Sequence, residues 1–257
     1  MNITEHPPEK KIVIRKFNFS CDEPDDSIPP PLPNILNFAW FICGRPGSSK
    51  TTLVLNLLCK QGKNYNGKFD KVYIVSPSLG TMEGNPFGSI PEEQMYNDLS
   101  LETLESILEE IGETGEKVLV VMDDCVNDMR KNKKVETLLA KCLMNRRHLC
   151  GYGGSTAFMI TSQVYNKIPA AVRKTASHLT VYHTKNKREL DTIFDETILI
   201  PKTDFYKILN HCFKSKYDFC HMDLNKPFNE MFYHNFNRLT FRTVSYTHLT
   251  LPTILRV

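Results

Sequence analysis

The feature that most constrains the fold is a glycine- and serine-rich loop set between two apolar segments. Residues 38–43 read FAWFIC, a short continuous apolar run, and residues 44–51 read GRPGSSKT. Apolar side chains then recur with the spacing of one helix face, at Leu53, Val54, Leu57 and Leu58. The order predicts a buried strand, a tight loop and a helix, which is a building unit of α/β folds.

The loop matches the pattern GxxxxGK[ST] except at Ser49, where glycine is usual. In such loops, successive backbone N–H groups turn inward and a helix N-terminus adds positive potential, so phosphate binds. Lys50 is expected to reach the terminal phosphates and the Thr51 hydroxyl to ligate Mg²⁺. The alternative is a turn without a ligand. The predicted nucleotide contacts are Gly44, Arg45, Pro46, Gly47, Ser48, Ser49, Lys50, Thr51 and Thr52.

An apolar strand that ends in two aspartates forms a second motif. Residues 118–124 read VLVVMDD, so the strand delivers Asp123 and Asp124 to its carboxyl end. We expect Asp123 to hold the metal, mostly through water, and Asp124 to act as the general base that polarises the attacking water. The alternative is a surface turn. Asn127 and Asp128 extend the acidic turn and are interpreted as structural.

A further polar residue is expected beside these aspartates. The apolar strand 157–161 is followed by Gln163, which could hydrogen-bond the γ-phosphate or the lytic water; a helix cap or loop residue is the alternative. Arg146 and Arg173 are candidates for a catalytic arginine that acts in a neighbouring subunit. For either arginine, a solvated or salt-bridged surface position is the alternative.

Apolar strands alternate with amphipathic helices along the chain. This order predicts an α/β fold with a mostly parallel sheet that helices cover on both faces. Residues 79–98, rich in Gly, Pro and Asn, are predicted to form a loop. Further strands are expected at 71–75, 178–182 and 216–223, and helices at 104–111, 133–144, 168–175, 186–195 and 203–213.

Both ends of the chain differ from the middle. Residues 1–33 combine a predicted strand at 11–19 with an acidic and proline-rich connector, and the main domain is expected to span 34–243. Residues 244–253, VSYTHLTLPT, match the translation of a transposase adapter used in sequencing libraries. We therefore interpret 244–257 as a non-native tail that follows a truncation; a genuine β-like tail is the alternative.

Composition excludes several classes of protein. The chain is 41% hydrophobic and 24% charged, as in globular domains, and it has neither an apolar run of membrane-spanning length nor a signal-peptide pattern. The net charge of +3 is too small to indicate nucleic-acid binding by itself. Between Arg130 and Arg147, however, seven Lys and Arg residues face a single acid, Glu136. This stripe predicts contact with a DNA backbone, or else a solvated helix face.

With these residues in view, the chain resembles the FtsK–HerA superfamily of P-loop ATPases. It is similar in particular to the genome-packaging ATPases of large DNA viruses of the poxvirus type, of virophages and of polinton-like viruses. The resemblance covers about 34–225 and rests on FAWFICGRPGSSKTTLVLNLL, FDKVYIVSPS, VLVVMDDCVND, NRRHL and AFMITSQVYNKIPAAVRKTASHLTVYH. Ser49 is the main departure from the family pattern.

The resemblance implies a RecA-like core of the ASCE type, ATP hydrolysis with Mg²⁺, and a homo-oligomeric ring. The implied activity is translocation of double-stranded DNA into a capsid, with a capsid or portal component as partner. The implied location is the virion, a viral factory or the host cytoplasm, and the protein is not expected to be secreted. Two alternatives remain open: a P-loop nucleotide kinase-like enzyme, and a nucleotide-binding scaffold with weak turnover, which Ser49 would favour.

Overall fold

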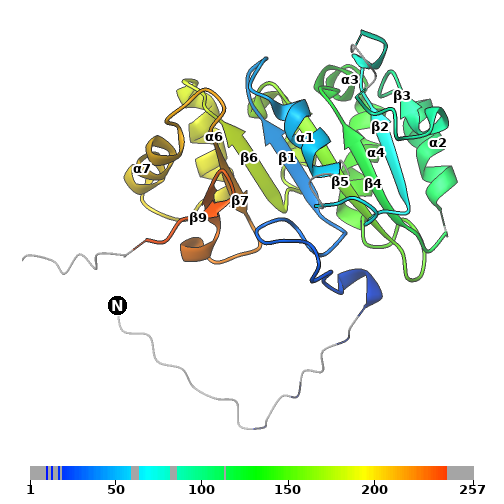
Figure 1. Cartoon of the computed structure of the whole chain (residues 1–257), viewed down its shortest axis with the longest axis horizontal. Coiled ribbons are helices and arrows are strands. Elements are labelled where there is room, and N and C mark those ends of the chain that lie inside the picture. The colour runs from blue at the N-terminus through cyan, green and yellow to red at the C-terminus, as the bar shows by residue number, and fades with distance from the viewer. Residues whose placement is uncertain are drawn as a thin grey trace, which may run out of the picture.

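The computed structural model describes residues 10, 13, 17, 19–58, 64–81, 86–112 and 114–241. Over these residues the chain forms a nine-stranded sheet with the order β3-β2-β4-β5-β1-β6-β7-β8-β9 (Figure 1). The strands are β1 (Ala39–Cys43), β2 (Lys71–Val75), β3 (Met95–Tyr96), β4 (Lys117–Met122), β5 (Ser155–Ser162), β6 (His178–Tyr182), β7 (Phe219–Asp223), β8 (Phe232–His234) and β9 (Asn237–Arg238). The predicted mostly parallel α/β sheet is therefore confirmed.

Seven α-helices connect or follow the strands of the described chain. They are α1 (Lys50–Leu58), α2 (Leu101–Ile111), α3 (Val126–Lys131), α4 (Lys133–Asn145), α5 (Ala170–Arg173), α6 (Lys187–Thr197) and α7 (Lys202–Cys212). Short 3-10 turns lie at Ser20–Asp22, Leu79–Thr81, Glu92–Gln94, Tyr165–Lys167 and Phe228–Glu230. None of the described helices is long and apolar enough to cross a membrane.

Strand order places three predicted site segments together. From β3 to β6 every neighbouring pair is parallel, and β5 lies between β1 and β4. In register, Cys43 pairs with Ser162, and Met122 pairs with Ile160. Because parallel strands end at the same edge of a sheet, the phosphate loop, the two aspartates and Gln163 all follow strands at one carboxyl edge.

The sheet buries both of its faces, as the continuous apolar strands predict. In β1, Ala39, Phe41 and Cys43 pack into one cluster, and Trp40 and Ile42 pack into the other. The first cluster also contains side chains of α2, α3, α4, α6 and α7. The second is covered by α1 and by the proline-rich connector, so helices lie on both faces but in unequal number.

Some elements differ from the sequence predictions. β7 begins at Phe219, not at 216, and it pairs antiparallel with β6. The predicted loop 79–98 contains the two-residue strand β3, and α3, β8 and β9 were not predicted. These elements have two to six residues, too few to show a hydrophobic period, so only pairing and packing define them.

The connector packs against the sheet over its described length. Ile28 and Leu32 are buried in the second cluster, and the Tyr65 hydroxyl donates a hydrogen bond of 2.9 Å to the Pro33 carbonyl. The predicted strand at 11–19 lies mostly outside the described residues, and the predicted non-native tail at 244–257 lies wholly outside them.

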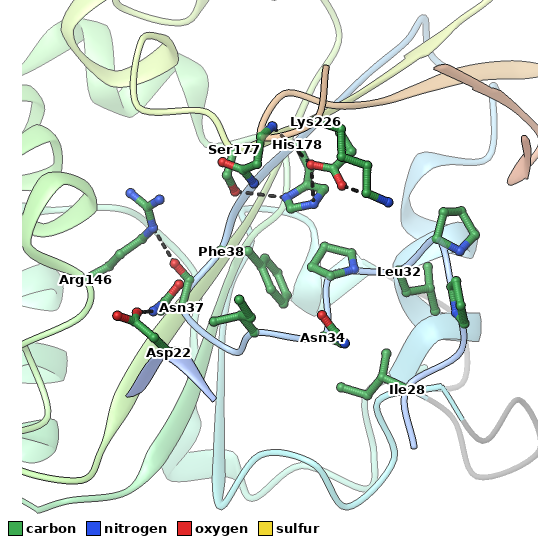
Figure 2. A pocket seen from close by; sticks show the side chains of 16 residues that line it. Asp22, Ile28, Leu32, Asn34, Asn37, Phe38, Arg146, Ser177, His178 and Lys226 are labelled. Atoms are coloured by element: carbon green, nitrogen blue, oxygen red, sulfur yellow. Dashed lines mark hydrogen bonds and ion pairs between the residues drawn. The ribbon is translucent and has the colours of Figure 1, made fainter. Parts of the chain in front are cut away.

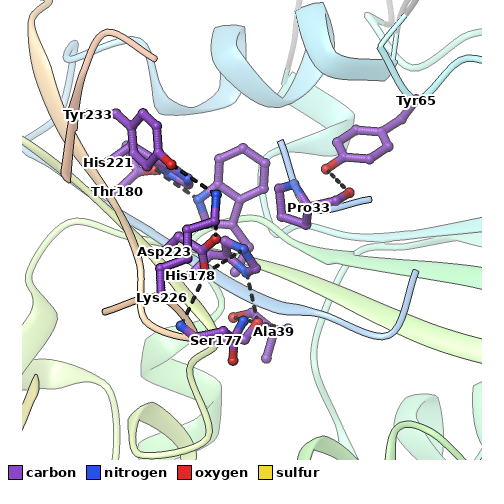
Figure 3. A network of polar contacts seen from close by, with 12 residues as sticks. Pro33, Ala39, Tyr65, Ser177, His178, Thr180, His221, Asp223, Lys226 and Tyr233 are labelled. Atoms are coloured by element: carbon purple, nitrogen blue, oxygen red, sulfur yellow. Dashed lines mark hydrogen bonds and ion pairs between the residues drawn. The ribbon is translucent and has the colours of Figure 1, made fainter. Parts of the chain in front are cut away.

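A buried polar network joins β1, β6 and β7 near the amino end of β1 (Figure 3). The Trp40 indole donates to the Thr180 hydroxyl at 2.8 Å, and that hydroxyl contacts His221 Nδ1 at 2.9 Å. His178 Nδ1 contacts the Ser177 hydroxyl at 2.9 Å, and its Nε2 lies 3.4 Å from Asp223, which also pairs with Lys226. Burial lowers the pKa of His178 to about 3 and that of His221 well below its usual value.

This network predicts a loss of stability in mild acid. A histidine whose pKa is depressed in the folded state takes up its proton only on unfolding, so its stabilising effect is complete above pH 6.5 and declines as the pH falls. We expect the free energy of unfolding in urea to fall by about 2 kcal/mol between pH 7.5 and pH 5.5. The variant His178→Gln should show a shallower pH dependence, and equal stability of the wild-type protein at both pH values would contradict the prediction.

Candidate functional site

The phosphate loop begins where β1 ends and closes where α1 begins at Lys50. Gly44 donates a backbone hydrogen bond of 3.0 Å to the Ser162 carbonyl, which ties the loop to β5. A Cβ atom on Gly44 would lie 2.6 Å from Ser48 Oγ and 2.7 Å from Tyr182 Cβ. Glycine is therefore required at the start of the loop by close packing against β6.

Two residues of the loop have left-handed backbone conformations. Gly47 has φ +71°, which costs glycine nothing, but Ser49 has φ +76°. Ser49 stands where the motif usually has glycine, and the structure gives the physical reason for that preference. An L-residue in this region bears roughly 1–2 kcal/mol of strain. The loop thus keeps its shape despite the serine, at a local cost in conformational energy.

Lys50 is folded back on its own loop. Its Nζ donates to the Gly44 carbonyl at 2.7 Å and to the Arg45 carbonyl at 3.3 Å. Burial lowers the pKa of Lys50, and the negative charges of Asp124 and Asp123 oppose that shift. The ammonium group therefore lies against the first two residues of the loop, in the electrostatic field of both aspartates.

Asp123 is the most connected residue of the site. Its carboxylate is buried and accepts hydrogen bonds from the Thr51 hydroxyl at 3.1 Å and from the Thr161 hydroxyl at 2.7 Å. Thr161 Oγ1 in turn accepts from the Asp124 backbone N–H at 3.0 Å. Thr161 was not among the residues predicted from the sequence. The sequence feature that could have indicated it is a hydroxyl near the end of an otherwise apolar strand.

The structure brings Asp124 and Gln163 into direct contact. The Gln163 side-chain amide donates to Asp124 Oδ2 at 2.6 Å, and Asp124 has a left-handed backbone with φ +58°. β4 and β5 are neighbours in the sheet, so the residues that follow their carboxyl ends meet at one edge. Asp124 is partly exposed, whereas Asp123 is buried, so only Asp124 of the pair is accessible to solvent water.

Thr51 and Asp123 suit Mg²⁺ by the chemistry of their donor set. A hydroxyl and a carboxylate lie 3.1 Å apart at a helix N-terminus, where phosphate oxygens would complete the coordination. Mg²⁺ is commonly bound through one or two carboxylates together with substrate phosphates and water. When bound, the ion would neutralise charge on the phosphate oxygens.

Arg146 lies at the opposite edge of the sheet from the phosphate loop. It follows α4 just before β5, and its Nε contacts the Asn37 carbonyl that precedes β1 (Figure 2). Its Nη1 donates to the Leu143 carbonyl at 2.7 Å, and burial lowers its pKa. Arg146 lines a cavity of about 420 Å³ together with His178, Asp223 and the proline-rich connector.

Arg173 forms an ion pair with an acidic residue of the same chain. Its Nε and Nη2 contact the two carboxylate oxygens of Glu196 at 2.7 and 2.5 Å, and its Nη1 donates to the Ile168 carbonyl at 2.8 Å. This bidentate pair raises the pKa of Arg173 and lowers that of Glu196. In a single chain, neither Arg146 nor Arg173 joins the residues around the phosphate loop.

Glu189 was also not selected from the sequence. It is buried in the first turn of α6 and accepts the Tyr165 backbone N–H at 2.6 Å and the Thr184 hydroxyl at 3.2 Å. Burial raises its pKa, and Arg45 of the phosphate loop opposes the shift. Glu189 therefore connects the segment that follows β5 with the segment that follows β6 through hydrogen bonds.

The conformation of Ser49 gives a test by substitution. Ser49→Gly removes the left-handed strain but adds chain entropy to the unfolded state, so we expect stability within about 0.5 kcal/mol of the wild-type protein. Ser49→Val places a β-branched side chain at positive φ and should cost about 2 kcal/mol. Urea unfolding measures both. Thr52→Val, at an exposed position of α1, is the control, and equal effects of the two valine variants would contradict the prediction.

Comparison with known proteins gives structural similarity only. No protein-family model matches the chain, and no curated protein has a matching sequence. The genome packaging NTPase B204 from Sulfolobus turreted icosahedral virus 2, solved with sulfate, has a TM-score of 0.53 and 15% identity, and the match covers 74% of this chain and 92% of that one. B204, the DNA-packaging ATPase from Sulfolobus turreted icosahedral virus, has a TM-score of 0.51 and 16% identity, with 80% and 98% covered.

The pCW3 conjugation coupling protein TcpA is also similar. Its TM-score is 0.55 at 13% identity, over 81% of this chain and 62% of that one. At these low sequence identities, the structural similarity establishes a common fold only. The activity follows from the chemistry of the site. The described chain thus has the RecA-like P-loop fold that the sequence resemblance implied.

Proposed function

We propose that this protein hydrolyses ATP with Mg²⁺ at the carboxyl edge of β1, β4 and β5. The observation that carries the proposal is the paired contact of Thr51 with Asp123 and of Gln163 with Asp124 around one phosphate loop. A site for metal-assisted phosphoryl transfer needs a phosphate cradle, a metal carboxylate and a group that positions the nucleophile. All of these predicted residues meet at this edge.

In the proposed reaction, the loop N–H groups and Lys50 hold the phosphates, and Gln163 and Asp124 position a water molecule. As the water oxygen attacks the γ-phosphorus, its proton passes to Asp124. The bond between the γ-phosphorus and the β–γ bridging oxygen breaks, and ADP and inorganic phosphate leave. Lys50 must release the Gly44 and Arg45 carbonyls to reach the γ-phosphate.

Water is favoured over an organic acceptor by the residues beside Asp124. An amide and a carboxylate in direct contact suit a small nucleophile that both can hydrogen-bond. Kinases instead need an acceptor site and an arginine-rich lid, neither of which the sequence predicts. The alternative of a nucleotide-binding scaffold with weak turnover is supported by the strain at Ser49. The measured rate of ATP hydrolysis distinguishes this alternative from an ATPase.

We further propose that hydrolysis drives double-stranded DNA into a viral capsid, with the chain acting in a homo-oligomeric ring. Support comes from the sequence resemblance, from the fold shared with the two B204 proteins, and from the basic stripe. α3 begins two residues after Asp124, and Arg130, Lys131 and Lys134 are exposed along it and the start of α4. A change at the aspartates can thus be transmitted directly to a basic surface.

In such a ring, Arg146 or Arg173 would complete a neighbour's site, and a capsid or portal component would be the further partner. For Arg173, that role requires release from Glu196. The same proposal places the protein in the virion, a viral factory or the host cytoplasm.

The role of Asp124 can be tested by removing its charge while keeping its shape. Asp124→Asn should retain ATP binding and lose at least about 100-fold in hydrolysis rate, because the amide cannot accept the water proton. Phosphate release and nucleotide binding are the two measurements. Asp128→Asn, four residues further along the chain, is the matched control and should hydrolyse ATP at the wild-type rate. Unchanged hydrolysis by Asp124→Asn would remove the assignment of the base.

The DNA proposal has a separate test. Double-stranded DNA should stimulate phosphate release several-fold at low salt, and the stimulation should weaken as salt rises, since backbone contacts release counterions. The triple variant Arg130→Gln, Lys131→Gln, Lys134→Gln should lose most of this stimulation while keeping its DNA-independent rate. The same rate with and without DNA in the wild-type protein would contradict a motor function.

A further inference from the structure

The carboxyl end of β5 contacts both motifs of the proposed site. Thr161 and Ser162 end this strand, which lies between β1 and β4, and Gln163 follows it (Figure 1). The Ser162 carbonyl accepts the backbone N–H of Gly44 in the phosphate loop at 3.0 Å. The Gln163 amide donates to Asp124, which follows β4. Thr161 therefore belongs to a short segment that connects the phosphate loop with the acidic end of β4.

The hydroxyl of Thr161 is buried and is engaged on both sides. It donates to Asp123 Oδ1 at 2.7 Å, and its oxygen accepts the Asp124 backbone N–H at 3.0 Å. A threonine hydroxyl carries a single proton. Because that proton is donated to Asp123, the hydroxyl has none to donate to a phosphate oxygen. The contacts of Thr161 thus lead to the two aspartates.

At Asp123, the hydroxyl distinguishes one carboxylate oxygen from the other. Asp123 is 4% exposed, and Thr51 is the other residue of the described chain whose hydroxyl contacts its carboxylate. The Thr51 hydroxyl lies 3.1 Å from both oxygens and favours neither, whereas Thr161 contacts Oδ1. The Oδ2 atom therefore keeps more acceptor capacity for a metal ion or for metal-bound water.

At Asp124, the hydroxyl holds a strained backbone. Asp124 has φ +58°, and left-handed conformations of L-residues persist where surrounding contacts maintain them. Thr161 contacts the backbone N–H of Asp124, and Gln163 contacts its carboxylate. These two residues are two positions apart, as residues on one face of a strand are. Together they restrain both the backbone and the side chain of the proposed base.

We propose that Thr161 is a positioning residue for ATP hydrolysis. Its hydroxyl orients the Asp123 carboxylate toward Mg²⁺ and holds the Asp124 backbone in the conformation that the base requires. The inference rests on the proposed function and adds a residue that connects the metal-binding part of the site with its water-activating part. Loss of this hydroxyl should therefore change two properties together, the dependence of nucleotide binding on Mg²⁺ and the rate of hydrolysis.

The test uses the full chain with three substitutions. Thr161→Val keeps the shape of the side chain and removes the hydroxyl, whereas Thr161→Ser keeps the hydroxyl. Thr156→Val is the matched control, because Thr156 is a buried threonine of the same strand whose hydroxyl lies 3.0 Å from Cys150 Sγ. Phosphate release from ATP is one measurement. The other is the dissociation constant of a non-hydrolysable ATP analogue, with Mg²⁺ and with EDTA.

We expect Thr161→Val to hydrolyse ATP at least tenfold more slowly than the wild-type protein. In EDTA it should bind the analogue within twofold of the wild-type protein, since the phosphate loop is unchanged. The gain in affinity that Mg²⁺ provides should be at least threefold smaller. Thr161→Ser should recover both properties to within threefold, and Thr156→Val should match the wild-type protein in both. Thermal unfolding verifies that each variant is folded.

Unchanged hydrolysis or an unchanged effect of Mg²⁺ in Thr161→Val would overturn the inference, because the proposal assigns both to one hydroxyl. Equal losses in Thr156→Val, or no recovery with serine, would also overturn it. If Thr161→Val does not fold, Thr161→Cys takes its place with the same expected direction, because a thiol is a weaker hydrogen-bond donor. No hydrolysis by the wild-type protein would instead refute the proposed function, and the effect of Mg²⁺ on analogue binding would still test the contact with Asp123.

Discussion

The arrangement of the site depends on how the buried carboxylate of Asp123 is satisfied. A buried charge is stable only when it is paired or hydrogen-bonded, and Asp123 receives hydroxyl donors from Thr51 and Thr161. One donor comes from the first turn of α1 and the other from β5, so the carboxylate joins three segments that are distant in sequence. Thr161 also receives the Asp124 backbone N–H, which sets the direction in which the chain leaves β4.

Backbone strain is concentrated at this same edge of the sheet. Ser49 and Asp124 both have positive φ, although neither is glycine; Ser49 directly precedes Lys50, and Asp124 is itself the predicted base. Strained backbone persists where the surrounding structure holds it in place, and it is common at functional sites. Here the packing of Gly44 against Tyr182 and the hydrogen bonds around Asp123 supply that restraint.

Local sequence patterns predicted the positions of the residues that belong to a single motif. The phosphate loop lies between β1 and α1, and the two aspartates directly follow β4, as predicted, because each position follows from the local hydrophobic pattern. Residues that act through distant partners were not found in this way. Thr161 and Glu189 belong to no local pattern, and their partners come from segments that are neighbours only in space. Arg146 and Arg173 were named for a role between subunits, and the structure shows the contacts that occupy them within one chain.

The sequence by itself determined the α/β class, the phosphate loop and the acidic end of β4, since apolar runs and loop residues act over a few neighbouring positions. The tertiary structure decided the strand order, with β5 between β1 and β4, and therefore which side chains meet. It also decided that Ser49 must adopt a left-handed conformation. These properties depend on pairing between segments more than 100 residues apart, such as β1 with β5, and no local pattern carries that information.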